Sequence, residues 1–130
     1  MIATSKDHLE EEGDFEEFVK THDLIMELFE HVPSLLLNVV PQLEEELKVE
    51  NSTIRQIASN TLGTMFSKRG SKWVDSYPHI FKTWCDRRND KNALIRMDWA
   101  EMAGSIVKNH PDLTQVMERE FFWFFIELTI

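Results

Sequence analysis

The chain has 130 residues, 42% of them hydrophobic and 28% charged, a balance that fits one small globular domain and excludes a wholly disordered chain. Its net charge of −9 comes from residues 1–50, with 14 acidic and 3 basic side chains, whereas residues 51–116 have 6 acidic and 10 basic ones. This charge disfavours general nucleic-acid binding but leaves a local basic surface open. The sequence predicts neither a signal peptide nor a membrane span, and Cys85 has no second cysteine with which to pair.

The N-terminal 50 residues predict a lead-in and two helical stretches. Residues 1–13 are expected to be flexible and acidic. A helix follows from Asp14, which is a candidate N-cap with Glu17 in the capping-box position. A second stretch covers Pro33–Lys48, and Pro41 should kink or split it. Its run Glu44–Glu46 is expected on the helix surface. The apolar side chains at helical spacing in the two stretches are Phe15, Phe18, Val19, His22, Ile25, Met26, Phe29, Leu36, Val40, Leu43 and Leu47.

Three more helices are predicted in the second half. One reaches about Lys68, with Asn51 or Ser52 as its cap and Gly70 closing the region. The next covers about Trp73–Arg88 with an early proline, Pro78, and the last covers about Ala93–Asn109. A further element should start at Pro111. The predicted buried residues of these helices are Ile54, Ile57, Ala58, Thr61, Leu62, Met65, Phe66, Trp73, Tyr77, Ile80, Phe81, Trp84, Cys85, Ile95, Trp99, Met102, Ala103, Ile106 and Val107.

A repeat of 41 residues is the most informative pattern. Ile54-Arg55 recurs as Ile95-Arg96, and Leu62-Gly63 recurs as Ala103-Gly104. A period near 41 with two helices per unit is typical of HEAT and armadillo repeats. The fold class expected is therefore all-α, a HEAT-type α-solenoid fragment of stacked helix pairs, with a generic helical bundle as the alternative. The repeat glycines should let neighbouring helices approach closely, and Asp90 is well placed for Arg96, whereas Arg55 has only Glu50.

Several motifs in residues 22–116 resemble the precocious-dissociation-of-sisters family, long HEAT-repeat accessory proteins of the cohesin ring. The motifs are Asp23-Leu24-Ile25, Val40-Pro41-Gln42-Leu43, Leu62-Gly63-x-Met65-Phe66, Trp84-x-x-Arg87-Arg88-Asn89-Asp90-Lys91, Ile95-Arg96 and Asn109-His110-Pro111-Asp112-Leu113. About two repeats and a flanking helix would occupy residues 14–116, as a fragment or truncated product of a longer array. Residues 117–130 form an atypical aromatic tail that departs from the family pattern.

The resemblance implies a nuclear, non-catalytic scaffold that regulates sister chromatid cohesion. Its implied partners are the kleisin subunit of cohesin and a cohesin release factor, with chromatin association and with neither a membrane nor a small-molecule substrate. A HEAT or armadillo adaptor for another protein partner is one alternative, and direct DNA binding through basic loops between helices is another.

Two candidate sites follow from the residues themselves. Six basic side chains lie in two loops that helix stacking could bring together, where they could hold an acidic partner segment, a polyphosphate or a DNA backbone. They are Lys68, Arg69, Lys72, Arg87, Arg88 and Lys91. Asp90 and Arg96 are expected to form a structural pair between loop and helix.

Catalytic and metal chemistry is not expected. The five histidines have no paired metal-ligand spacing, the sequence has no glycine-rich phosphate loop, and no cofactor motif is recognisable. Cys85 has no base beside it in the sequence and should be a buried thiol. Trp73, Trp84 and Trp99 lie on apolar helix faces and are expected in the core.

Overall fold

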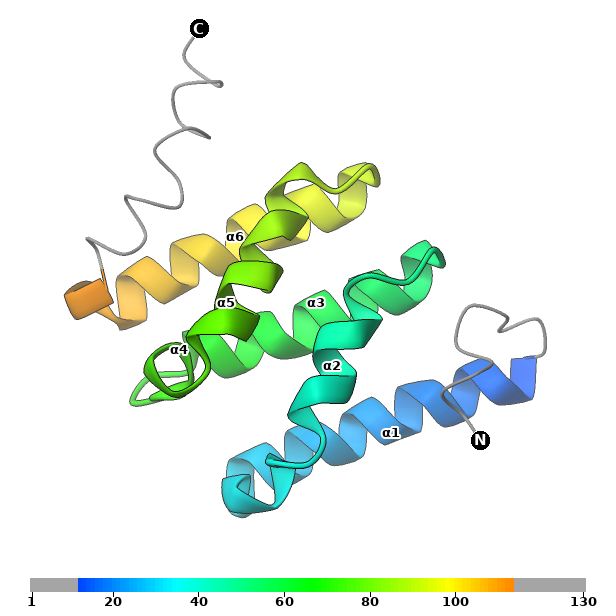
Figure 1. Cartoon of the computed structure of the whole chain (residues 1–130), viewed down its shortest axis with the longest axis horizontal. Helices are drawn as coiled ribbons and strands as arrows, with labels where there is room; N and C mark the ends of the chain where they lie inside the picture. Colours follow the sequence, from blue (N-terminus) through cyan, green and yellow to red (C-terminus); the bar gives the residue numbers. More distant parts are fainter. Residues whose placement is uncertain (1–11, 114–130) are drawn as a thin grey trace, which may run out of the picture. The chain divides into compact units, whose positions relative to one another are not determined.

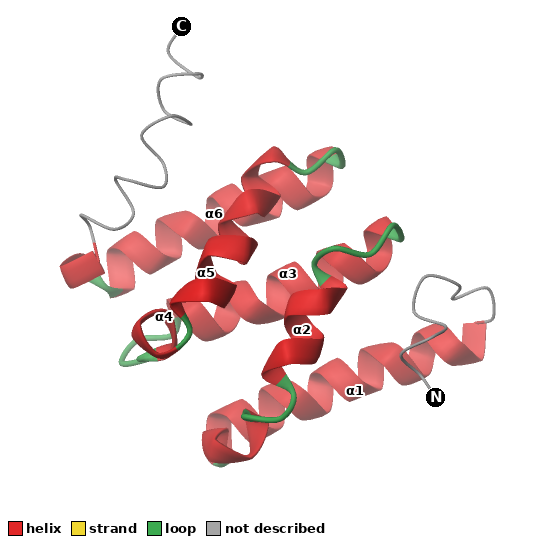
Figure 2. Ribbon diagram, in the orientation of Figure 1, coloured by secondary structure: helices red, strands yellow, loops and turns green. Residues whose placement is uncertain are grey.

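The structure, a computed structural model, describes residues 12–113, and this part of the chain contains helices and loops but no strand (Figure 2). The all-α prediction is therefore confirmed. The predicted tail at 117–130 and residues 1–11 of the predicted lead-in lie outside the described residues. By internal packing the chain divides into two compact units, one ending at Leu62 and one beginning at Gly63.

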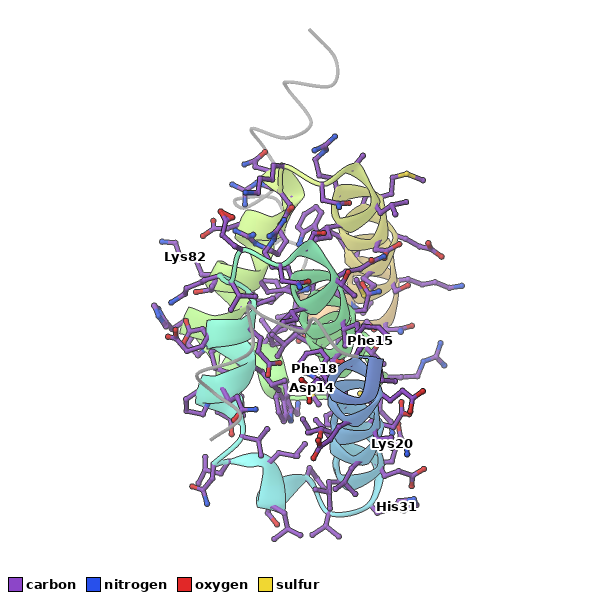
Figure 3. The ribbon with its side chains drawn as sticks, turned by 90° about the vertical axis from the view of Figure 1, so that its right-hand side faces the viewer. Asp14, Phe15, Phe18, Lys20, His31 and Lys82 are labelled. Atoms are coloured by element: carbon purple, nitrogen blue, oxygen red, sulfur yellow. The ribbon has the colours of Figure 1, made fainter. Side chains whose placement is uncertain are left out.

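The first unit begins with helix α1, Glu12–His31. The helix starts two residues before the predicted cap Asp14, so Asp14 lies inside the first turn, where a negative charge favours the helix N-terminus. Phe18 is buried on the inner side of α1, and Lys20, on its opposite side, is exposed (Figure 3).

The predicted second stretch is split, as its internal proline suggested. A 3-10 turn, η2, covers Pro33–Leu36, and helix α2 covers Val40–Glu46. Pro41 lies in the first turn of α2, where its missing N–H removes no helical hydrogen bond. The predicted face is confirmed, since Leu36, Val40, Leu43 and Leu47 are all buried. Glu46, however, is also buried, so the prediction that the whole run Glu44–Glu46 lies on the surface is wrong.

Helix α3, Ser52–Ser67, runs through the boundary between the two units. Asn51 rather than Ser52 caps it, because Asn51 Oδ1 accepts the backbone N–H groups of Thr53 and Ile54 at 2.9 and 3.1 Å. The predicted buried stripe of α3 is confirmed apart from Ile57, which is half-buried. After α3, Gly70 adopts a φ of 85°, a left-handed backbone conformation that glycine tolerates without strain.

Up to residue 113, where the described part of the chain ends, the second unit contains the end of α3 followed by helices α4, α5 and α6 (Figure 1). Helix α4 covers Trp73–Ser76, and α5 covers Pro78–Cys85. The 3-10 turn η3 covers Asp86–Asn89. Helix α6 covers Ala93–Asn109, as predicted, and the turn η4 covers Pro111–Leu113.

The fourth predicted helix is interrupted at Tyr77, and prolines explain this and two other breaks. Val32, Tyr77 and His110 each precede a proline, and each has φ between −141° and −130° and ψ between 61° and 72°. These angles lie outside the helical region, from which the proline ring displaces the preceding residue. Helices α1, α4 and α6 therefore end for the same reason, because the residue after each of them precedes a proline.

The core of the second unit is aromatic. Phe66 of α3 contacts Phe81 and Trp84 of α5, with ring centroids 5.2 and 5.6 Å apart. Trp84 in turn contacts Trp99 of α6 at 5.4 Å. The buried positions predicted for Trp73, Trp84, Trp99 and Cys85 are confirmed. In α6 the prediction is wrong for Val107, which is 38% exposed, and Met102 is half-buried.

Candidate interaction site

The loop before α6 is built around Asp90, which is buried. One carboxylate oxygen, Oδ2, accepts from Arg87 Nη1 at 2.7 Å, and the other, Oδ1, accepts the backbone N–H of Asn92 at 2.8 Å. Arg96 Nη1 donates to the backbone carbonyl of Asp90 at 2.6 Å. The expected contact between Asp90 and Arg96 is therefore present, but it uses the main chain, because Arg87 and Asn92 already bind the carboxylate.

The same arrangement recurs 41 residues earlier, before α3. Arg55 Nη1 donates to the carbonyls of Val49 and Glu50, at 3.0 and 2.6 Å. Val49 corresponds to Asp90, and Arg55 corresponds to Arg96. In both repeats an arginine in the first turn of the second helix thus holds the carbonyl at the same repeat position. We call this pair of contacts the arginine clasp.

The two helix caps also correspond. Asn92 Oδ1 accepts the backbone N–H groups of Leu94 and Ile95 at 2.9 and 3.4 Å, as Asn51 does for α3. Asn51 and Asn92 are 41 residues apart. The asparagine cap and the arginine clasp together fix the backbone of each loop where it joins α3 or α6. The hydrogen bonds therefore recur at the same 41-residue spacing as the sequence pattern.

Two of the three predicted basic residues after α5, Arg87 and Arg88, already have structural roles. Arg87 forms the ion pair with the buried Asp90 carboxylate, and its own side chain is 21% exposed. Arg88 Nη1 donates to the carbonyl of Cys85 at 2.7 Å, which satisfies a main-chain acceptor at the end of α5. Lys91 is exposed in the loop.

The other predicted basic residues lie after α3. Lys68 is half-buried, while Arg69 and Lys72 are exposed. This loop is held against the end of α6 by two side chains. Asn109 Nδ2 donates to the carbonyl of Ser67 at 2.7 Å, and His110 Nε2 donates to that of Lys68 at 2.8 Å.

The two basic loops lie at opposite ends of α6 (Figure 1). A helix of 17 residues is about 25 Å long. The six side chains are therefore not brought together into one patch. They form two groups, which we call the α3–α4 loop group (Lys68, Arg69, Lys72) and the α5–α6 loop group (Arg87, Arg88, Lys91).

A buried polar network in the first unit was missed by sequence reasoning. His22 of α1 contacts Thr61 Oγ1 through Nδ1 and Glu46 Oε1 through Nε2, both at 2.8 Å. All three residues are buried. The spacing of the sequence indicates that both residues are buried, because His22 lies on the apolar face of α1 and Glu46 lies three residues after the buried Leu43. Glu46 is, however, the last of three consecutive glutamates, a pattern that usually indicates an exposed surface.

We find no grouping of metal-ligating side chains in residues 12–113 that could hold an ion. Within the same residues, no helix is both long enough and apolar enough to cross a membrane. What the described surface offers is exposed loops at the ends of a regular helical repeat, an arrangement that suits macromolecular contacts.

The fold and the 41-residue spacing at which its loop contacts recur define the class: an all-α protein of HEAT-like helix pairs. The family model described as "Sister chromatid cohesion protein PDS5 protein" matches residues 1–122. The chain belongs to this family. The match includes the first residues of the tail that we had set apart from the family pattern.

Curated relatives agree with this assignment. The chain is 32% identical to sister chromatid cohesion protein pds5 of Schizosaccharomyces pombe over 118 residues, which is 91% of this chain and 10% of that protein. It is 33% identical over 93 residues to PDS5 homolog A of Homo sapiens, and likewise to that of Gallus gallus, in each case 72% of this chain and 7% of the relative. The chain therefore spans a tenth or less of the length of these relatives.

Proposed function

We propose that this chain is a non-catalytic scaffold of sister chromatid cohesion that acts in the nucleus and binds the kleisin subunit of cohesin and a cohesin release factor. The observation that carries the proposal is membership of the PDS5 family over residues 1–122. The relatives' names connect them with sister chromatid cohesion. The partners themselves come from the family resemblance, and the structure supports them only by offering exposed repeat loops.

The α3–α4 loop group is the better candidate contact of the two. Arg69 and Lys72 are exposed, and the loop that presents them is fixed at its base by Asn109 and His110. A basic loop on a fixed base suits an acidic segment of an extended partner, since opposite charges on two surfaces speed and orient association. Arg87 and Arg88, by contrast, are already engaged within the fold.

Direct DNA binding is a weaker alternative for this chain. Its net charge is −9, and its two basic groups are separated by the length of α6 instead of lining one continuous surface. Neutralising several neighbouring phosphates requires a contiguous basic footprint. An acidic peptide needs only a few contacts, so a protein partner fits the charge distribution better.

The test is a fluorescence-anisotropy titration of the chain with labelled kleisin segments. We expect saturable binding that weakens as salt is raised, because exposed charges are screened. Arg69→Glu/Lys72→Glu should weaken binding by about tenfold, which corresponds to about 1.4 kcal/mol. The variant should keep the helical circular dichroism of the parent, because both side chains are exposed.

A matched control is Lys20→Glu, which reverses an exposed charge on α1 (Figure 3). It should leave kleisin binding unchanged. If the chain is helical and monomeric but does not bind any kleisin segment, the proposal that this chain binds kleisin is contradicted. Tight binding of a DNA duplex without kleisin, lost in the Arg69→Glu/Lys72→Glu variant, would favour the DNA alternative.

A further inference from the structure

The turn that follows α1 exposes large apolar side chains. Val32 is 43% exposed, Leu35 59% and Leu37 63%, although Leu36 between the two leucines is fully buried. Successive residues of a 3-10 helix are about 120° apart, so the burial of Leu36 directs the leucines before and after it outward. We call the three exposed residues Val32, Leu35 and Leu37 the apolar turn.

Main-chain hydrogen bonds hold the apolar turn in place. The N–H of Val32 donates to the carbonyl of Leu28 at 2.7 Å, and the N–H of Leu35 donates to the carbonyl of Val32 at 3.1 Å. The N–H of Val39 donates to the carbonyl of Leu36 at 2.8 Å, which connects the turn to the start of α2. A surface already held in one conformation loses little conformational entropy when a partner binds to it.

The other repeat shows that the fold does not require exposed apolar residues at this turn. Ser76 stands 41 residues after Leu35 and is exposed, whereas Trp73, which stands 41 residues after Val32, is buried. The second unit therefore exposes a polar residue and covers the apolar one at the corresponding positions. A cluster of exposed apolar side chains, unlike a single one, indicates an interaction surface.

The charge around the apolar turn is negative. Residues 21–47 contain six acidic side chains and neither lysine nor arginine. Glu27 and Glu30 are exposed near the C-terminal end of α1, which His31 marks in Figure 3. In the next repeat, Lys68 of the α3–α4 loop group stands 41 residues after Glu27. The connections that follow α1 and α3 therefore present opposite charges and suit different partners.

We propose that the apolar turn docks a basic amphipathic segment of a partner protein, in which large apolar side chains lie beside lysine or arginine. The apolar side chains of the segment remove the apolar turn from water, and its cations face Glu27 and Glu30. The negative charge disfavours a nucleic acid or an anionic membrane, because either would bring phosphates against these carboxylates. The proposal does not depend on kleisin binding at the oppositely charged α3–α4 loop group.

The probe for the test is a fluorescein-labelled peptide of leucine and lysine at helical spacing. It is titrated with the whole chain and followed by fluorescence anisotropy. We expect saturable binding that weakens as salt is raised. A peptide with glutamate in place of each lysine, and one with serine in place of each leucine, should each bind at least about tenfold more weakly.

Leu35→Ser/Leu37→Ser should weaken binding of the leucine–lysine peptide by at least about tenfold, because it removes two apolar side chains from the docking surface. The matched control is Leu94→Ser/Met97→Ser on α6, where the two side chains are 57% and 66% exposed, and it should leave the affinity unchanged. Both variants should keep the helical circular dichroism of the parent. If the first does not, Leu35→Ala/Leu37→Ala replaces it in the titration.

Glu27→Gln/Glu30→Gln tests the contribution of charge. It should weaken binding of the leucine–lysine peptide by about fivefold at low salt, because two exposed carboxylates no longer attract its lysines, and this difference should shrink at high salt. The matched control is Glu16→Gln/Glu17→Gln, which removes two exposed charges near the other end of α1 and should leave the affinity unchanged.

Three results would overturn the proposal. The first is no saturable binding of the leucine–lysine peptide by the helical parent chain. The second is that Leu35→Ser/Leu37→Ser binds no more weakly than Leu94→Ser/Met97→Ser. The third is a dimer in sedimentation velocity that Leu35→Ser/Leu37→Ser dissociates, which would mean that a second copy of the chain covers the apolar turn. Weakening confined to the variants of the apolar turn and of Glu27 and Glu30 supports the proposal.

Discussion

Gly63 lies where the end of α3 meets α5 and α6. A Cβ at this position would overlap with Met102 Sδ and lie 3.0 Å from Met102 Cε and 3.1 Å from Trp84 Cζ2. The methionine is flexible and half-buried, so it can move, but the buried indole ring of Trp84 cannot move without disturbing Phe66 and Trp99. The close approach predicted for the repeat glycines is confirmed at Gly63, but it is wrong for Gly104, where an added Cβ would meet nothing within 4 Å.

Gly63→Val should lower the free energy of unfolding by about 2 kcal/mol, the usual cost of forcing extra atoms into a packed interior. Urea denaturation followed by circular dichroism measures it. Gly13→Ala in α1 is the control, because nothing lies within 4 Å of its added Cβ, and it should be neutral or slightly stabilising. An unchanged midpoint for Gly63→Val would mean that α6 can shift away from α3.

The buried pair His22–Glu46 illustrates a different residue-scale constraint. Both side chains are nearly inaccessible, and their contact of 2.8 Å links α1 to α2. Breaking such a pair by removing one partner is costly, because the other polar group stays buried, whereas replacing both by apolar groups is often tolerated. The two single variants and the double variant therefore distinguish a polar network from simple packing.

His22→Leu should lower the free energy of unfolding by about 3 kcal/mol. The double variant His22→Leu/Glu46→Leu should recover part of that loss, so that it is more stable than His22→Leu alone. Chemical denaturation of the parent, both single variants and the double variant completes a double-mutant cycle. Additive losses would show that the two side chains do not act as a pair.

At the scale of elements, the helix boundaries follow from single residues. Prolines end three helices through the residues that precede them, and Asn51 and Asn92 begin the two long second helices of the repeats. The sequence predicted α6 to the residue because Asn92 before it and Pro111 after it are both strong signals. The apolar pattern predicts one helix over α4 and α5 because it is continuous across Tyr77, whereas Pro78 holds the backbone of Tyr77 outside the helical region.

Asn92→Ala should lower the free energy of unfolding by about 1 kcal/mol, since the two N–H groups of Leu94 and Ile95 lose their acceptor. Thermal denaturation of the variant gives the loss. Asn92→Ser keeps an acceptor at the cap and should cost much less. Equal losses for Ala and Ser would assign the role of Asn92 to something other than capping.

At the scale of the molecule, the period of 41 residues gave most of what could be predicted. It predicted the helix pairs, the close glycine and the corresponding arginines without any structure. It could not predict how far apart the basic loops lie, because both precede a helix in sequence but flank opposite ends of α6 in space. The repeat period also does not predict that Arg87 binds the Asp90 carboxylate and that Arg96 binds the Asp90 backbone carbonyl instead.

The arginine clasp has a consequence for how such an array can change over evolutionary time. Val49 in one repeat and Asp90 in the next offer the same acceptor, because every residue has a backbone carbonyl. The side chain at this loop position can therefore be replaced without loss of the clasp. Evolution can therefore change which groups the side chain at this position binds within its loop, as the Asp90 carboxylate binds Arg87 and Asn92, while the contact of the arginine with the main chain is kept.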